Sequence, residues 1–160
     1  MKKQQYILIA LVVVTLSSLL LPGVAMGFRP FQICMFSEIN AVVTLNGKPV
    51  IGAEIVRTSN ELDSKVYTEK TTTDEQGKFH FAALWVFSLR NWIPANPMIK
   101  QNLTITYQGI EHQGWFGVKN NYGLNDELDD NKPLNLTCEL SDEPSLKYQS
   151  RGNIKGICKW

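Results

Sequence analysis

The sequence has little of what catalysis and metal binding require. It holds two histidines, His80 and His112, in 160 residues, and no G-x-S-x-G surrounds Ser37, Ser88 or Ser141. A nucleophilic triad needs a base that a third group positions. The three cysteines form no CxxC pair, so a four-ligand zinc site is not expected either. We therefore predict a protein that is not an enzyme and that uses no cofactor or metal.

A strong charge of one sign is also missing. The formal net charge is +1, and 14 basic residues face 15 acidic ones once Lys2 and Lys3 are set aside. Binding to nucleic acid independently of sequence requires clustered lysine and arginine opposite phosphates. The composition therefore argues against a nucleic-acid partner.

The sequence lacks a long membrane-spanning run and has a shorter apolar run near the N-terminus. Lys2 and Lys3 precede apolar residues from Tyr6 to Leu21, and the small residues Ala25 and Gly27 follow. This order of features is typical of a secretory signal peptide. We predict a signal peptide over residues 1–27, one domain over residues 28–160, and a periplasmic or secreted location.

The alternative for the same segment is a signal anchor that is not cleaved. The run is shorter than the roughly 20 residues that span a bilayer. If it is retained, the protein is attached to the inner membrane through residues 6–21, and only then is the membrane a partner.

Three cysteines are few enough to restrict the disulfide pairing. An oxidising compartment favours pairing two of them. Cys138 with Cys158 attaches the C-terminal tail to the last strand, whereas Cys34 with Cys138 joins the first strand to the last. We expect the first pairing and keep the second as its alternative.

Short runs of alternating polar and apolar residues, separated by turn signals, fill the chain beyond residue 35. Gly47 follows an asparagine, the strongest short hairpin signal, and Pro49 opens the next run. Asp74 and Gly77 mark a second turn. Phe79 and Phe81 then fall on one face of a strand. The pattern predicts an all-β sandwich with these phenylalanines in its core.

Two segments resemble carboxypeptidase-regulatory-like (transthyretin-like) domains. Residues 46–55, NGKPVIGAEI, are similar to their G-x-P-V-x-G-A-x-V opening, and residues 72–81, TTDEQGKFHF, to their T-x-T-D-x-x-G-x-F-x-F segment. The resemblance implies a seven-stranded antiparallel β-sandwich and supplies no catalytic residue. As a whole, the chain looks like a group of small exported bacterial proteins of uncharacterised function.

Aromatic residues gather where the alternation stops, between residues 85 and 101. Tryptophan combines apolar area with a hydrogen-bond donor and often anchors a partner. We predict that the partner-binding residues are Trp85, Arg90, Trp92 and Trp115. The structural alternative places Trp85 and Trp115 at the ends of the core and stacks Arg90 on Trp92.

These features predict a non-catalytic exported module that binds a protein or glycan, with an immunity or inhibitor protein as one form of it. The first alternative is a membrane-anchored structural domain. The second is a carbohydrate-handling enzyme that uses the 85–101 loop and the acidic segment 125–130, with Glu111, His112 or Asp126 beside a tryptophan. Acidic loops are usually only solvated, and this one lacks a calcium-loop spacing.

Overall fold

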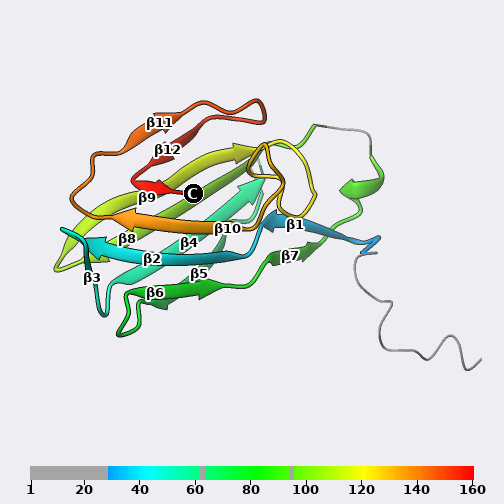
Figure 1. Cartoon of the computed structure of the whole chain (residues 1–160). Coiled ribbons are helices and arrows are strands. Elements are labelled where there is room, and N and C mark those ends of the chain that lie inside the picture. Colours follow the sequence, from blue (N-terminus) through cyan, green and yellow to red (C-terminus); the bar gives the residue numbers. More distant parts are fainter. Residues whose placement is uncertain (1–28, 62–63, 94–95) are drawn as a thin grey trace, which may run out of the picture. The chain divides into compact units, whose positions relative to one another are not determined.

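The alternating pattern produces strands along nearly the whole described chain. The computed structural model describes residues 29–61, 64–93 and 96–160, which contain β-strands and no α-helix (Figure 1). The all-β prediction is therefore confirmed. The predicted signal segment, residues 1–27, lies outside the described residues. Within the described ranges, no helix is long and apolar enough to cross a membrane.

The described residues form thirteen strands and one 3₁₀ turn. In chain order they are β1 (Gln32–Phe36), β2 (Ile39–Leu45), β3 (Lys48–Pro49), β4 (Glu54–Glu61), β5 (Tyr67–Thr72), β6 (Lys78–Phe81), β7 (Leu84–Phe87), η1 (Arg90–Trp92), β8 (Ile99–Tyr107), β9 (Ile110–Lys119), β10 (Leu134–Glu139), β11 (Ser145–Lys147), β12 (Ile154–Gly156) and β13 (Cys158–Lys159).

Two sheets enclose the main core. One has the order β13-β10-β2-β3, with β6 also paired to β2, and the other has the order β11-β12-β9-β8-β4-β5 (Figure 1). Inward residues of both sheets pack together, among them Val43, Phe79, Phe81, Leu103 and Trp115. A separate two-stranded ribbon, β1 with β7, covers a smaller cluster of Ile33, Met35 and Ile99.

The strand directions differ from the expected antiparallel pattern at one pair. β10 runs parallel to β2, with Leu134 opposite Ile39 and Glu139 opposite Thr44. A tight hairpin forces neighbours to be antiparallel, but these two strands are joined by a long connection through the other sheet. The expectation that all strands pair antiparallel was therefore wrong here.

Two glycines are required by the turns around β2. Asn46 and Gly47 have φ of 51° and 74°, as the two-residue hairpin between β2 and β3 demands. Gly77 has φ of 73°, and a Cβ there would lie 2.5 Å from the carbonyl oxygen of Val43. Pro49 ends the exposed strand β3, where a missing N–H is tolerated.

The turn before β6 is fastened by a carboxylate. Asp74 Oδ1 accepts hydrogen bonds from the backbone N–H of Gln76 at 2.9 Å and of Lys78 at 2.8 Å. An aspartate that binds the backbone two residues on is an Asx turn. This turn places Phe79 and Phe81 inward, with their rings 6.0 Å apart.

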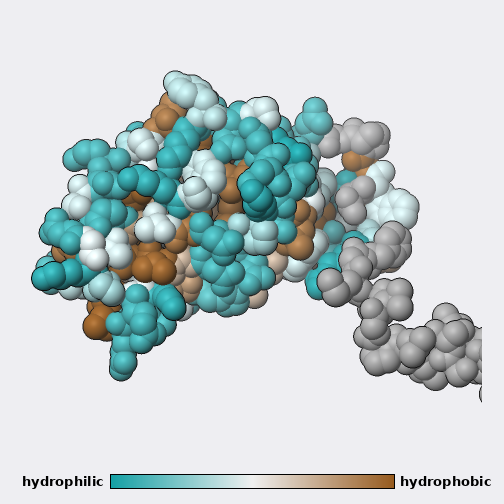
Figure 2. Space-filling view, viewed as in Figure 1, coloured by the Kyte–Doolittle hydropathy of each residue, from teal (hydrophilic) through white to brown (hydrophobic). Residues whose placement is uncertain are grey.

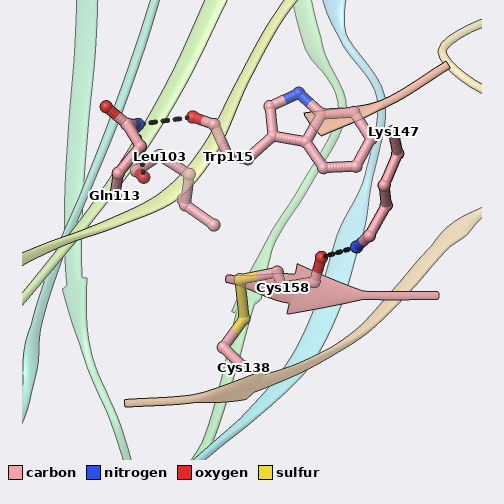
Figure 3. The surroundings of a disulfide bond; sticks show 6 residues. All are labelled: Leu103, Gln113, Trp115, Cys138, Lys147 and Cys158. Atoms are coloured by element: carbon pink, nitrogen blue, oxygen red, sulfur yellow. Dashed lines mark hydrogen bonds between the residues drawn. A yellow bond between two sulfur atoms is a disulfide. The ribbon is translucent and has the colours of Figure 1, made fainter. Parts of the chain in front are cut away.

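A disulfide joins Cys138 of β10 to Cys158 of β13, which confirms the expected pairing (Figure 3). Cys34 of β1 is buried and free, so the alternative pairing of Cys34 with Cys138 was wrong. Lys147 of β11 donates a 2.6 Å hydrogen bond to the carbonyl of Cys158. The C-terminal strands are thus held to the sandwich covalently and by side-chain contacts.

Candidate interaction surface

The segment after β6 is more regular than its composition predicts. Leu84–Phe87 form strand β7, which pairs with β1, and the described residues 88–93 and 96–98 lie outside the strands. Within them Arg90–Trp92 form a single 3₁₀ turn, η1, with Trp92 N–H donating to the Leu89 carbonyl at 3.1 Å. The expected irregular loop therefore begins after Phe87, because β1 supplies a partner strand that the sequence does not reveal.

Large apolar side chains point outward around this turn. The ring of Phe31 lies 6.3 Å from that of Phe87 and 6.3 Å from that of Trp92, measured between centroids. Phe87 is 73% exposed and Trp92 65% exposed. We call the set formed by Phe31, Phe87, Leu89, Trp92 and Ile93 the aromatic surface. In the view of Figure 2, hydrophobic residues show only as small areas between hydrophilic ones around β1 and β7, so the aromatic surface is defined by its residues.

The size of the aromatic surface sets it apart from scattered apolar residues. All five of its members are about half exposed or more. Phe31, Phe87 and Trp92 alone expose roughly 300–450 Å², taking about 150–250 Å² for each aromatic side chain. The largest apolar patch on a typical monomer is of this size and is often functional. The aromatic surface is therefore the strongest candidate for an interaction site among the described residues.

A polar network holds the base of this surface. Arg90 Nη1 lies 3.0 Å from Glu61 Oε1 at the end of β4, and the Tyr122 hydroxyl donates to the same oxygen at 2.7 Å. The hydrogen bond and charge of Glu61 raise the pKa of Arg90. Burial, and then the hydrogen bond to Glu61, raise the pKa of Tyr122 to about 12. The network fixes η1 against β4 and the 120–131 loop.

The four predicted contact residues do not share one surface. Trp92 belongs to the aromatic surface, and Arg90 holds the same turn in place through its ion pair with Glu61. Trp85 is half-buried in β7, opposite Cys34 of β1. Trp115 is 1% exposed and packs edge-on against Trp160, with the ring centroids 5.6 Å apart. Naming Trp115 as a contact residue was wrong, because its place in β9 points inward.

The acidic segment is occupied by the chain's own contacts. Asp126 pairs with Arg151 at 2.5 Å, and Asp129 accepts from the hydroxyl of Ser150 at 2.6 Å. Asp130 pairs with Lys132 at 2.8 Å. Within the described ranges, no group of three or more metal-ligating side chains converges.

The residues of the enzyme alternative lie apart. Glu111 and His112 lie near the start of β9, opposite Thr106 and Ile105, while Asp126 contacts Arg151 near the far end of that strand. A groove of about 630 Å³ follows the outer face of β2, and its lining includes none of the three and no tryptophan. The described structure therefore does not assemble the catalytic pocket that this alternative requires.

A buried polar cluster that the sequence analysis did not predict lies beneath β1. Lys119 Nζ is 3.2 Å from Glu127 Oε1, and both side chains are inaccessible to solvent. Glu127 also accepts from the backbone N–H of Ser37 at 2.9 Å and its hydroxyl at 2.6 Å, and from Gln101 Nε2 at 2.9 Å. Lys119 donates to the carbonyl of Cys34 at 3.3 Å.

The electrostatics of this cluster stabilise the charged form of Glu127. Burial alone would raise the pKa of Glu127, but the charge of Lys119 and the hydrogen bonds from Ser37 and Gln101 outweigh it and lower the pKa. Burial raises the pKa of the Cys34 thiol, which keeps it a poor nucleophile. Because no member is open to solvent, the cluster has a structural role and attaches the 120–131 loop to β1.

A family described as "Domain of unknown function (DUF6795)" matches residues 39–143. The chain belongs to this family. The DUF6795 match begins with β2 and ends just beyond β10, so it contains the parallel pair and the strands β4, β5, β8 and β9. It includes Phe87, Leu89, Trp92 and Ile93, while Phe31 lies outside it. No curated protein and no solved structure matches the chain.

Proposed function

We propose that this DUF6795 protein is a non-catalytic, exported interaction module that binds its partner through the aromatic surface. The single observation that carries the proposal is the cluster in which the ring of Phe31 lies beside those of Phe87 and Trp92, while the latter two stay more than three-fifths exposed. Exposing such rings to water costs free energy that docking recovers. Tryptophan is also among the residues that dominate binding energy at interfaces.

Two further features support an address outside the cytoplasm. The disulfide between Cys138 and Cys158 suits an oxidising compartment. The charged start and apolar run of residues 2–21 have the order of an export signal. Together they favour a partner in the bacterial envelope. The identity of that partner will decide what kind of module this is, for example an inhibitor-type protein.

The scaffold proposed for this module is a β-sandwich of the carboxypeptidase-regulatory-like kind. The two motif segments that carry the resemblance form the β2–β3 hairpin with its approach to β4, and the β5–β6 turn. These turns lie on the sandwich itself, away from η1. The two motif segments therefore serve as the framework, and the aromatic surface lies outside both of them.

The proposal is tested by cross-linking in cells that express the full chain. A photo-activated group at position 89, inside the aromatic surface, is expected to give a defined adduct in the envelope fraction. Trp92→Ala is expected to reduce its yield at least tenfold, since the loss of an anchoring tryptophan costs about 2 kcal/mol or more.

The matched control is Tyr148→Ala, because Tyr148 is an aromatic residue that is 80% exposed and lies outside the aromatic surface. The adduct should keep its wild-type yield in this variant. Equal yields from wild type, Trp92→Ala and Tyr148→Ala would refute docking through the aromatic surface.

A further inference from the structure

The aromatic surface lies a short chain length from the apolar run near the N-terminus. Leu21 ends this run, and Phe31 is the first member of the aromatic surface along the chain. Ten peptide steps separate them, which reach at most about 35 Å when fully extended. Any membrane that holds the run therefore has the aromatic surface within reach.

From this we infer that residues 6–21 are retained as the uncleaved signal anchor, the alternative of the sequence analysis, and that the occupant of the aromatic surface is the interfacial region of the membrane that holds them. The inference rests on the proposed function and names its partner. The run from Tyr6 to Leu21 has sixteen residues, fewer than the roughly 20 that cross a bilayer comfortably. A weak anchor of this kind becomes stable when a second membrane contact is added.

The chemistry of the aromatic surface fits a headgroup region. Tryptophan, the residue type of Trp92, is enriched at membrane–water interfaces, because its ring is apolar and its N–H is polar. Phe31, Phe87, Leu89 and Ile93 supply apolar side chains that can enter the boundary with the acyl chains. Arg90 lies in the same turn as Trp92, and its ion pair with Glu61 holds that turn in place.

Covalent attachment makes even a weak contact effective. A short tether turns the docking step into an intramolecular one with an effective concentration in the millimolar range. The five apolar side chains therefore need only modest affinity for lipid to stay docked. The same side chains on a freely diffusing domain would bind vesicles only transiently.

The test uses the full chain reconstituted into phosphatidylcholine vesicles whose acyl chains carry bromine close to the headgroups. Bromine quenches a tryptophan that enters the interface. Trp92 is one of four tryptophans, so wild type is expected to lose about a quarter of its emission in brominated relative to plain vesicles. In Trp92→Phe, which keeps an apolar ring, this loss is expected to disappear.

A second variant separates insertion from the identity of the fluorophore. Phe87→Gln keeps all four tryptophans but removes apolar area beside Phe31. It is expected to weaken the quenching of Trp92 about twofold or more, while Tyr148→Gln leaves it unchanged. Circular dichroism checks that each variant retains its β-structure.

Two outcomes would overturn the inference. One is equal emission in brominated and plain vesicles for wild type that co-floats with the vesicles. The other is N-terminal sequencing of the protein from its native host that begins after Ala25 or Gly27, because the tether to the run would then be gone. If quenching is absent but Trp92→Ala still abolishes a protein adduct at position 89, the proposed function stands with a protein partner. If both readouts are silent, the proposed function fails as well.

Discussion

The buried cluster under β1 and the aromatic surface beside it reverse the usual distribution of side chains. In the cluster, Lys119 and Glu127 carry charge where no solvent reaches, and each has several hydrogen-bond partners. On the aromatic surface, Phe87 and Trp92 are apolar and largely exposed. The two regions meet β1 at different ends, since Phe31 precedes the strand and Ser37 follows it.

The difference shows where each region obtains its stability. A buried charge is tolerated only when partners replace its lost hydration. In the cluster, these partners all belong to the chain itself. The exposed part of an aromatic side chain remains in water in the folded chain, and burying that area against a partner releases further free energy. The first region should therefore control folding, and the second should control binding.

The largest effect is expected from breaking the buried ion pair. Glu127→Ala leaves Lys119 buried without its carboxylate and is predicted to lower the free energy of unfolding by about 3–5 kcal/mol. Urea unfolding followed by circular dichroism measures this. Asp130→Ala, in the same loop but exposed, serves as the control and should change the free energy by less than about 0.5 kcal/mol.

A variant with both charges removed sharpens that result. Lys119→Met with Glu127→Leu should recover most of the loss, because paired apolar replacements avoid an unpaired buried charge. A double variant as unstable as Glu127→Ala would mean that packing, and not the unpaired charge, determines the cost.

The next effect concerns the disulfide that joins β10 to β13. Cys138→Ser with Cys158→Ser opens a loop of 20 residues and should lower the free energy of unfolding by roughly 3 kcal/mol. Docking through the aromatic surface should persist below the unfolding transition. Loss of docking in a folded double variant would show that the disulfide and the aromatic surface are not independent.

A smaller effect depends on pH and on Glu139. Its carboxylate accepts from the Ser141 hydroxyl at 2.6 Å and the Gly47 N–H at 3.0 Å, and these contacts lower the pKa of Glu139 to about 2. The folded state thus binds the proton less tightly than the unfolded state, whose value is near 4.5.

The sign follows from this difference in pKa. The contribution of Glu139 is complete above about pH 4.5 and is lost as the pH falls toward 2. Because the carboxylate is solvent-exposed, it amounts to about 1 kcal/mol. Glu139→Gln should remove this part of the pH dependence, measured by thermal melts between pH 2 and 7. A wild-type slope that Glu139→Gln leaves intact would contradict the assignment.

The sequence predicts the framework well because its signals are local. The turns follow from the backbone geometry of Asn46–Gly47 and Asp74–Gly77. Polar and apolar residues alternate in the next strand, which places Phe79 and Phe81 on one face. Strand direction across the sheet is not local, so the parallel pairing of β2 with β10 could not be read from residues 95 positions apart. The pairing of β1 with β7 was hidden for the same reason.

The candidate site was only partly predictable. Trp92 stood out by its residue type and irregular surroundings, but Phe31 joins it only through folding. Trp115 looked similar in sequence, and its inward position became clear only from the register of β9. For the buried cluster one signal existed: Gln101 is a polar residue at an inward position between Ile99 and Leu103.

The smallest change in the free energy of unfolding should come from a substitution in the aromatic surface. Such a variant compares the aromatic surface with the buried cluster most directly. Trp92→Ala in the full chain is measured twice, by urea unfolding and by adduct yield or lipid quenching. The free energy of unfolding is predicted to change by less than about 0.5 kcal/mol, while docking falls at least tenfold. A loss of stability comparable to that of Glu127→Ala, with docking retained, would contradict the division of roles.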